Sequence, residues 1–443
     1  MLLATVFGIL TISFTSPFKV PDEAAHFIRA YEVSEGVFLP TIQNNLTVAL
    51  LPKQLKETLD VVDKFAFSNS KITLQDLNPN GAKIDYSDKV LVRSATGQYS
   101  PFPYIVTATS LKVVRVFSDN PLTLYFCGKI MALLSWTTMI FLAIKIIPFG
   151  RWLMLLLALL PIHLFLAPSF SADSAINSAT FLLIAIVLQL HYSKDTVKYL
   201  RLKLCTVVFL LLSICLSKTV YIFLLPLLFL IPARYFHNRT RYFIYGGSTL
   251  LLVIGAHLFW FNYIHGLHEE RVANVFPKEQ LAFILSDPSE FLKIMLTSAK
   301  DNFSGYICSF IGILGWLDIH LSAWIYCTYP VVLLSSLFFT DKKEISIHYS
   351  LRLLSLIIFL IGALIIAVAL YCTWNPLRSP VLNGIQGRYF ISFSLLGALP
   401  FFALPHLHYY CKRQWVLGAF IMLYLNFVWV CVEVILKSSY LYY

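Results

Sequence analysis

Apolar segments that approach the thickness of a lipid bilayer recur along almost the whole of this chain. A hydrocarbon core of about 30 Å requires about 20 apolar residues of helix, because the backbone in lipid must satisfy its own hydrogen bonds. Polar or basic breaks separate eleven such segments: 1–17, 122–147, 152–168, 175–191, 204–217, 220–233, 243–264, 323–340, 353–371, 389–407 and 415–436. The sequence therefore predicts an all-α polytopic membrane protein, with one membrane domain over residues 1–443.

The balance of residue types supports this fold class. Only 13% of the residues are charged and 58% are hydrophobic, whereas soluble proteins carry roughly 25% charged residues. The net charge of +11 could suggest a nucleic-acid partner, but no water-soluble stretch interleaves basic and aromatic residues. In a membrane protein an excess of Lys and Arg is explained by topology, so we expect a membrane-lipid environment and no nucleic acid.

Basic residues mark one side of the membrane. If the expected spans alternate, the breaks that carry Lys and Arg all fall on the same side, which the positive-inside rule makes cytoplasmic. These residues are Lys145, Arg151, Lys194, Lys198, Arg201, Lys203, Arg234, Arg239, Arg241, Lys342, Lys343, Arg352, Lys412 and Arg413. Met1 to Ser16 lacks a basic start and a cleavage site, so we expect an uncleaved first span with its N-terminus in the cytoplasm.

The long polar segments fall on the opposite side. Residues 18–121 form the first and longest outer loop, and 265–322 form a second outer segment. Within the first, 104–117 is expected to be an amphipathic helix on the membrane surface. Within the second, 303–319 is too rich in glycine for a span and predicts a re-entrant or interfacial element. A third, shorter segment covers 372–388.

Two adjacent carboxylates, Asp22 and Glu23, follow the first span directly. Charged groups that cluster at a membrane face are costly to bury and are usually functional. A carboxylate there can act as a general base toward a hydroxyl group, and a neighbouring carboxylate with partial burial raises one pKa toward the working pH. The alternative is that both acids stabilise a helix N-terminus after Pro21. The sequence favours Asp22 weakly and leaves the choice between the two open.

His26 and Arg29 follow on the same expected helix. His26 lies four residues after Asp22, on the same helical face, where it could orient a carboxylate or contact a phosphate; an ordinary polar loop histidine is the alternative. Arg29 could bind phosphate, but an ion pair with Glu23 or Glu32 is favoured.

Lone charged groups in apolar sequence provide the remaining candidates. Lys218 and Arg388 would bind a phosphate, Arg388 through two parallel hydrogen bonds and Lys218 as a point charge; snorkelling toward the headgroups is the alternative. Asp173 could contribute to binding, although a helix N-cap is favoured. Further candidate binding residues at this face are Asp318, Gln386 and Tyr389.

Motifs for soluble cofactors are absent from the sequence. It contains no Walker A loop, no GxGxxG, no HExxH and no metal-type Cys/His spacing. We therefore expect no nucleotide cofactor and no dedicated metal site, and the residues leave a role for a divalent metal open.

Five motifs occur in an order that resembles a known family. They are Pro21-Asp22-Glu23 with His26, Ser171-Ala172-Asp173 with Asn177, Ser217-Lys218, Gly315-Trp316-Leu317-Asp318, and Gln386-Gly387-Arg388-Tyr389-Phe390. The set, from about residue 18 to 405, resembles a family of bacterial membrane proteins related to the C-type (GT-C) integral-membrane glycosyltransferases. In size and layout the chain is also similar to the enzymes that glucosylate O-antigen during serotype conversion.

The resemblance implies a GT-C-like bundle of about eleven transmembrane helices with a long first outer loop. It implies a polyprenyl-phosphate sugar donor, a lipid-linked glycan or O-antigen acceptor, and a catalytic acid in the first outer loop, where Asp22 and Glu23 lie. It also implies a bacterial inner membrane with the active site on the periplasmic face. The alternative function is a transporter or flippase of a lipid-linked sugar, although no internal repeat of the kind common in transporters is evident.

Overall fold

The computed structural model describes residues 2–65, 74–78, 81–193, 197–264, 274–340, 347–403, 409–410 and 413–438. Some residues used above lie outside these ranges. They are the topology residues Lys194, Lys342, Lys343 and Lys412, residue 1 of the expected first span, residues 66–73 and 79–80 of the first outer loop, residues 265–273 of the second outer segment, residues 404–407 of the expected tenth span, and residues 439–443 at the end of the membrane domain.

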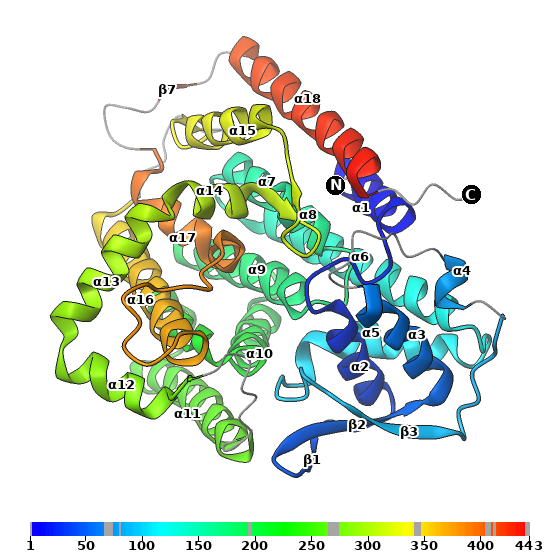
Figure 1. Cartoon of the computed structure of the whole chain (residues 1–443). Helices are drawn as coiled ribbons and strands as arrows, with labels where there is room; N and C mark the ends of the chain where they lie inside the picture. Colours follow the sequence, from blue (N-terminus) through cyan, green and yellow to red (C-terminus); the bar gives the residue numbers. More distant parts are fainter. Residues whose placement is uncertain are drawn as a thin grey trace.

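Five described helices are long and apolar enough to cross a membrane, and most of the described chain is helical (Figure 1). They are α6 (Pro121–Ile146), α9 (Ala172–Tyr192), α10 (Leu200–Ser217), α11 (Arg239–Ile264) and α16 (Tyr349–Trp374). In the most apolar stretch of α9, 83% of the residues are buried, whereas the value for α11 is 17%. Helix α9 is therefore the centre of the bundle and α11 is peripheral. The described chain fits the prediction of an all-α membrane protein, although it also contains a three-stranded sheet and two two-stranded sheets that the sequence did not predict.

The predicted number of eleven spans is not confirmed, because several expected spans are short or broken. Helix α1 (Leu2–Phe14) has 13 residues, and span 152–168 divides into α7 (Arg151–Ala158) and α8 (Pro161–Leu166). Span 220–233 is the 3-10 helix η2 (Thr219–Leu230), and span 389–407 divides into η4 (Gly387–Phe393), α17 (Ser394–Ala398) and η5 (Leu399–Phe401). Proline contributes to these breaks, since it removes an N–H donor and restricts the preceding residue; Pro161 begins α8, and Pro226 lies inside η2.

The first outer segment folds into a small helical and β-stranded cap. Its elements are α2 (Glu23–Ser34), β1 (Thr41–Gln43), β2 (Leu46–Pro52), α3 (Lys53–Phe65), α4 (Leu74–Leu77), β3 (Lys89–Arg93), η1 (Phe102–Tyr104) and α5 (Ile105–Val114). The strands form an antiparallel sheet in the order β1-β2-β3, with Leu50 opposite Leu91. Helix α5 covers most of the expected amphipathic segment and packs against α2 and α6.

The later segments complete the other side of the molecule. They are η3 (Ala233–Tyr235), α12 (Pro277–Ser286), α13 (Pro288–Asp301), α14 (Phe303–Gly312), the hairpin β4 (Ile313–Leu314) and β5 (Ile319–His320), α15 (Ala323–Ser335), β6 (Phe339–Thr340), β7 (Tyr409–Tyr410) and α18 (Arg413–Ser438). The glycine-rich element 303–319 is thus a short helix followed by a hairpin. In Figure 1, α18 lies beside α1 and α15, at the edge of the bundle.

The packing of α9 brings distant parts of the chain to one place. Helix α9 contacts α10, η1, η2 and η4, and η4 also packs against α14. Consequently several parts of the chain lie around one end of the bundle. They are the first turn of α9, the residue that ends α10, the start of η4, and the cap helices α2 and α5.

Candidate active site

Asp22 stands at the entry of the cap, as the residue that precedes α2. Its backbone is in the left-handed region, with φ 59°, and its side chain makes no capping hydrogen bond. Asp and Asn tolerate this conformation better than most residues. The residue is exposed, so its carboxylate is accessible to a substrate.

Glu23, the next residue, points into the protein. It is 1% exposed, and Tyr125 Oη donates to its Oε2 at 3.1 Å while the amide of Phe170 donates to Oε1 at 3.4 Å. The ammonium of Lys129, on α6, lies 3.9 Å from Oε1. Burial raises the pKa of the Glu23 carboxyl, although Lys129 and these hydrogen bonds oppose the shift. Glu23 therefore anchors α2 to the membrane bundle, and of the acidic pair only Asp22 faces solvent.

His26 is held through its Nδ1 atom. The hydroxyl of Tyr104 lies 2.6 Å from Nδ1, and the rings of Tyr99 and Tyr104 flank the imidazole with centroid distances of 5.6 and 5.8 Å. Burial lowers the pKa of His26 to about 4, although Asp22 and Asp173 oppose this shift. The imidazole is therefore neutral at physiological pH.

Lys218 and Asp173 form an ion pair between the end of α10 and the first turn of α9. Burial by itself would lower the pKa of Lys218, but the Asp173 carboxylate holds that pKa above its usual value. The N-cap of α9 is Ser171, whose Oγ accepts from the amide of Asp173 at 3.3 Å. The expected N-cap role of Asp173 thus belongs to Ser171, which leaves the Asp173 side chain free to pair with Lys218.

Arg388 approaches the same place from η4. Its guanidinium lies over the ring of Tyr389 at 5.5 Å, and the ammonium of Lys218 lies 5.7 Å from that ring centroid. Arg388 is 9% exposed, and its Nε has no hydrogen-bond partner among the described residues. The Oε1 atom of Gln386 is likewise buried without a partner in the described part of the chain.

The backbone of Gly387 fixes the position of η4. A Cβ atom at this glycine would collide with the carbonyl oxygen of Tyr306 and with the amide of Phe310, both on α14. The amide of Gly387 also donates to Ser309 Oγ at 2.8 Å. Only glycine permits this approach, so it sets the place from which the Arg388 side chain leaves the backbone.

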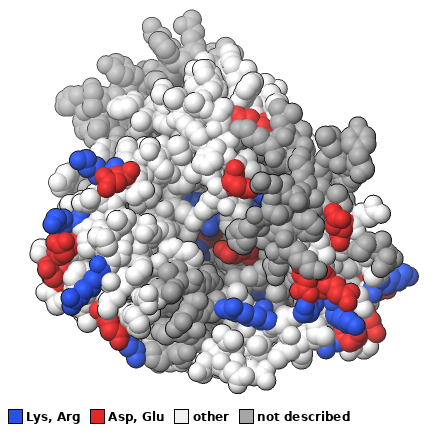
Figure 2. All heavy atoms as spheres, viewed as in Figure 1, with Lys and Arg blue, Asp and Glu red and all other residues white. Residues whose placement is uncertain are grey.

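Six of the ten predicted site residues therefore lie in one charged cluster: Asp22, His26, Asp173, Lys218, Arg388 and Tyr389. The charges of the two acids and the two cations all act on His26. Figure 2 shows acidic and basic atoms meeting near the centre of this face, set below the surrounding white atoms. Within the described residues no group of three His, Cys, Asp or Glu side chains is arranged for a metal ion.

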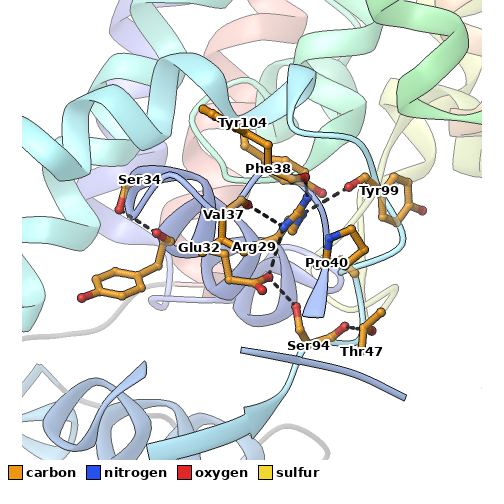
Figure 3. Close-up of polar contacts among 12 residues, drawn as sticks. Arg29, Glu32, Ser34, Val37, Phe38, Pro40, Thr47, Ser94, Tyr99 and Tyr104 are labelled. Carbon is orange, nitrogen blue, oxygen red and sulfur yellow. Dashed lines mark hydrogen bonds and ion pairs between the residues drawn. The ribbon is translucent and has the colours of Figure 1, made fainter. Parts of the chain in front are cut away.

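Arg29 and Asp318 lie outside the cluster. Arg29 is completely buried, and its guanidinium donates to the carbonyl oxygens of Tyr99, Val37 and Phe38 at 3.2, 3.2 and 2.6 Å (Figure 3). The predicted pairing with Glu32 is present at 3.5 Å. Asp318 pairs with Lys19 at 2.6 Å, at an exposed position beside the β4–β5 turn.

Two partners in the site were not identified from the sequence. Tyr104 lies in an aromatic stretch that offers no spacing signal toward His26, 78 residues away. Lys129 did carry a signal, because it is a lone charge inside an apolar span and such residues are usually paired. That rule predicts an acidic partner for Lys129, and the structure identifies it as Glu23.

Comparison with known proteins identifies a family and no characterised relative. A family described as "Predicted membrane protein (DUF2142)" has a model that matches residues 5–396. No curated protein and no solved structure matches this chain.

Proposed function

The chain belongs to the DUF2142 family of predicted membrane proteins, and from that premise we propose that it is an inverting glycosyltransferase. It would transfer a sugar, such as glucose, from a polyprenyl-phosphate donor to a lipid-linked glycan or O-antigen acceptor. The observation that supports this proposal most is the cluster in which accessible Asp22 interacts with Arg388, while Lys218 and Arg388 both lie over the ring of Tyr389. An exposed base beside a cationic pocket suits the transfer of a group away from phosphate.

Asp22 is the proposed general base. Its carboxylate would accept the proton of the acceptor hydroxyl as that oxygen attacks the anomeric carbon. The new bond forms between the acceptor oxygen and the sugar while the bond between the sugar and the phosphate oxygen breaks. Attack from the side opposite the leaving group inverts the anomeric configuration.

Lys218 and Arg388 are the proposed phosphate ligands. The electron pair of the broken bond leaves with the polyprenyl phosphate, and fixed cations stabilise that developing charge. The Nε of Arg388, which has no hydrogen-bond partner in the described segments, gives the guanidinium a donor for a phosphate oxygen. Asp173 provides the counter-charge for Lys218, so donor binding would shift Lys218 from Asp173 toward the phosphate.

The proposed location is a bacterial inner membrane with this cluster on the periplasmic side. Basic residues at the other end of α9 support that orientation: Arg234 donates to the carbonyl oxygens of His191 and Ser193 at 3.2 and 2.7 Å. Asp173 and His191 are 18 residues apart on α9, which corresponds to roughly 27 Å along a helix and nearly the thickness of the bilayer core. A basic cytoplasmic end and a mixed-charge outer end follow the positive-inside rule.

A transfer assay tests the proposal. Purified protein in nanodiscs would receive radiolabelled polyprenyl-phosphate sugars and a pool of lipid-linked glycan, and the wild type would be compared with Asp22→Asn. Asn tolerates the left-handed backbone of position 22, so the variant removes the base without straining the chain. We expect label in the glycan with the wild type and none with the variant.

Two other results would contradict parts of the proposal. Equal transfer by Asp22→Asn would remove Asp22 as the base and leave the enzyme class standing. No transfer with any donor, together with movement of labelled lipid across a proteoliposome membrane, would favour the transporter hypothesis.

A further inference from the structure

The first outer segment carries an apolar surface that neither the fold nor the proposed reaction uses. Four large apolar side chains in and beside the loop before the sheet are exposed: Val37 by 36%, Phe38 by 56%, Leu39 by 43% and Ile42 by 41%. We call these four residues the apolar tip. Exposed apolar side chains that lie together often mark a site of contact with a protein or a membrane.

Hydrogen bonds from the protein interior fix the backbone of the apolar tip. The buried guanidinium of Arg29 donates to the carbonyl oxygens of Val37 and Phe38, as Figure 3 shows. A buried charge that satisfies its hydrogen bonds with backbone carbonyls fixes those backbone atoms strongly. The side chains of the tip are therefore presented outward from a defined backbone.

The tip is also attached to the end of a peripheral membrane helix. Tyr263 Oη, in the last turn of α11, donates to the carbonyl oxygen of Pro40 at 3.2 Å. Trp260 Nε1, one turn earlier, donates to the carbonyl oxygen of Gln98 at 2.9 Å. In Figure 1 the β1–β2 hairpin lies beside the same end of α11.

The surface of helix α11 beside the apolar tip is apolar and exposed. It is the least buried of the five spanning helices, and Phe259 and Phe261, near its end, are 60% and 47% exposed. Trp and Tyr concentrate at the level of the lipid headgroups in membrane proteins. The apolar tip therefore adjoins the end of the spanning helix that protein covers least.

We propose that the apolar tip inserts into the headgroup and upper acyl region of the bilayer, on the side of the membrane that holds the charged cluster. Its partner is the lipid surface, which apolar and aromatic side chains enter without spanning it. The inserted tip would hold the cap, and with it Asp22 and His26, at a set height above the bilayer. This inference does not depend on the proposed reaction.

Depth-dependent fluorescence quenching tests the insertion. A fluorescent amino acid would replace Phe38 in the full-length protein, reconstituted in nanodiscs whose lipids carry a nitroxide near the headgroup. Matched labels at Phe259 and at exposed Glu57, on the charged helix α3, provide the lipid-facing and water-facing controls. All three positions are on the surface, so we expect each variant to fold. Gel-filtration profiles would check this.

We expect the label at position 38 to lose fluorescence to the nitroxide lipids as the label at 259 does, and to be protected from iodide in water. The label at 57 should show the reverse. Quenching at position 38 that matches position 57 would overturn the proposal, because the tip would then face water. Protection from both quenchers would also overturn it, since protein would then cover the tip.

Discussion

The carboxylate of Glu23 and the ammonium of Lys129 lie 3.9 Å apart in the interior, although 106 positions separate them in the chain. Both side chains are almost completely inaccessible. The pair connects the first turn of the cap helix α2 to the spanning helix α6, and it sits directly behind the accessible Asp22. Its role is therefore to place the candidate base rather than to react.

Loss of one partner of this pair should destabilise the protein. Glu23→Gln leaves Lys129 without its counter-charge. It also places the amide group of the glutamine, which is a donor, near Tyr125 Oη and the Phe170 amide, which are donors themselves. We therefore expect the free energy of unfolding to fall by about 3 kcal/mol. The midpoint of thermal unfolding in detergent would measure the change. The double variant Glu23→Gln/Lys129→Met should recover part of the loss, because it removes the unpaired charge. An unchanged midpoint in the single variant would contradict the anchoring role.

Replacement of Arg388 should impair transfer more than replacement of a cation outside the cluster. Loss of one group that stabilises developing charge costs about 10²–10³ in kcat, so we expect that loss for Arg388→Gln. Arg388→Lys should recover activity only in part, since lysine keeps the charge without the planar fork. Lys19→Met is the control, because Lys19 pairs with the exposed Asp318. Equal losses for Lys19 and Arg388 would contradict a specific phosphate site.

A methyl group at Gly387 should displace η4. Its Cβ would collide with backbone atoms of Tyr306 and Phe310, and overpacking of this kind costs about 1–3 kcal/mol. We expect Gly387→Ala to lower both the unfolding temperature and the rate of sugar transfer. Gly305→Ala, on the adjoining α14, is the matched control because, apart from its own neighbours and helix backbone, no atom of the described residues lies within 4 Å of its Cβ position. A harmless Gly387→Ala would show that the close approach is not required.

His26 should make stability depend on pH in the acid range. Its pKa is about 4 in the folded protein, against an ordinary value of 6.5, so the unfolded chain binds more protons between these limits. Stability should therefore fall as the pH falls from about 6.5 to about 4, by up to about 3 kcal/mol from this group. The groups that face it are Asp22 and Asp173, which oppose the shift, and Lys218 and Arg388, which favour it.

The variant His26→Asn isolates this contribution, since its amide lies near the position of Nδ1 but does not titrate. Unfolding temperatures measured across this pH range should fall less steeply for the variant than for the wild type. Parallel curves would show that the protonation of His26 is not linked to folding.

The amino-acid sequence alone predicts that this protein folds in a lipid bilayer and that its unusual polar groups gather at one membrane face. Long apolar runs predict membrane helices because the backbone in lipid must bond to itself, and this class was confirmed. Alternating spans also predicted that Asp22, His26, Asp173, Lys218 and Arg388 share one face, and the structure places them together. Hydropathy could not predict the number of continuous helices, because prolines such as Pro161 and Pro226 break apolar sequence without changing its composition.

The different roles of residues that are neighbours in the sequence follow from the tertiary structure. Asp22 and Glu23 have the same chemistry and adjacent positions, and the left-handed turn at Asp22 directs one carboxylate outward and the other toward Lys129. For Arg29 the sequence favoured an ion pair over phosphate binding, and the structure adds three backbone carbonyl oxygens that accept hydrogen bonds from its guanidinium. Such assignments depend on contacts between residues far apart in the chain, and these form only when the helices pack.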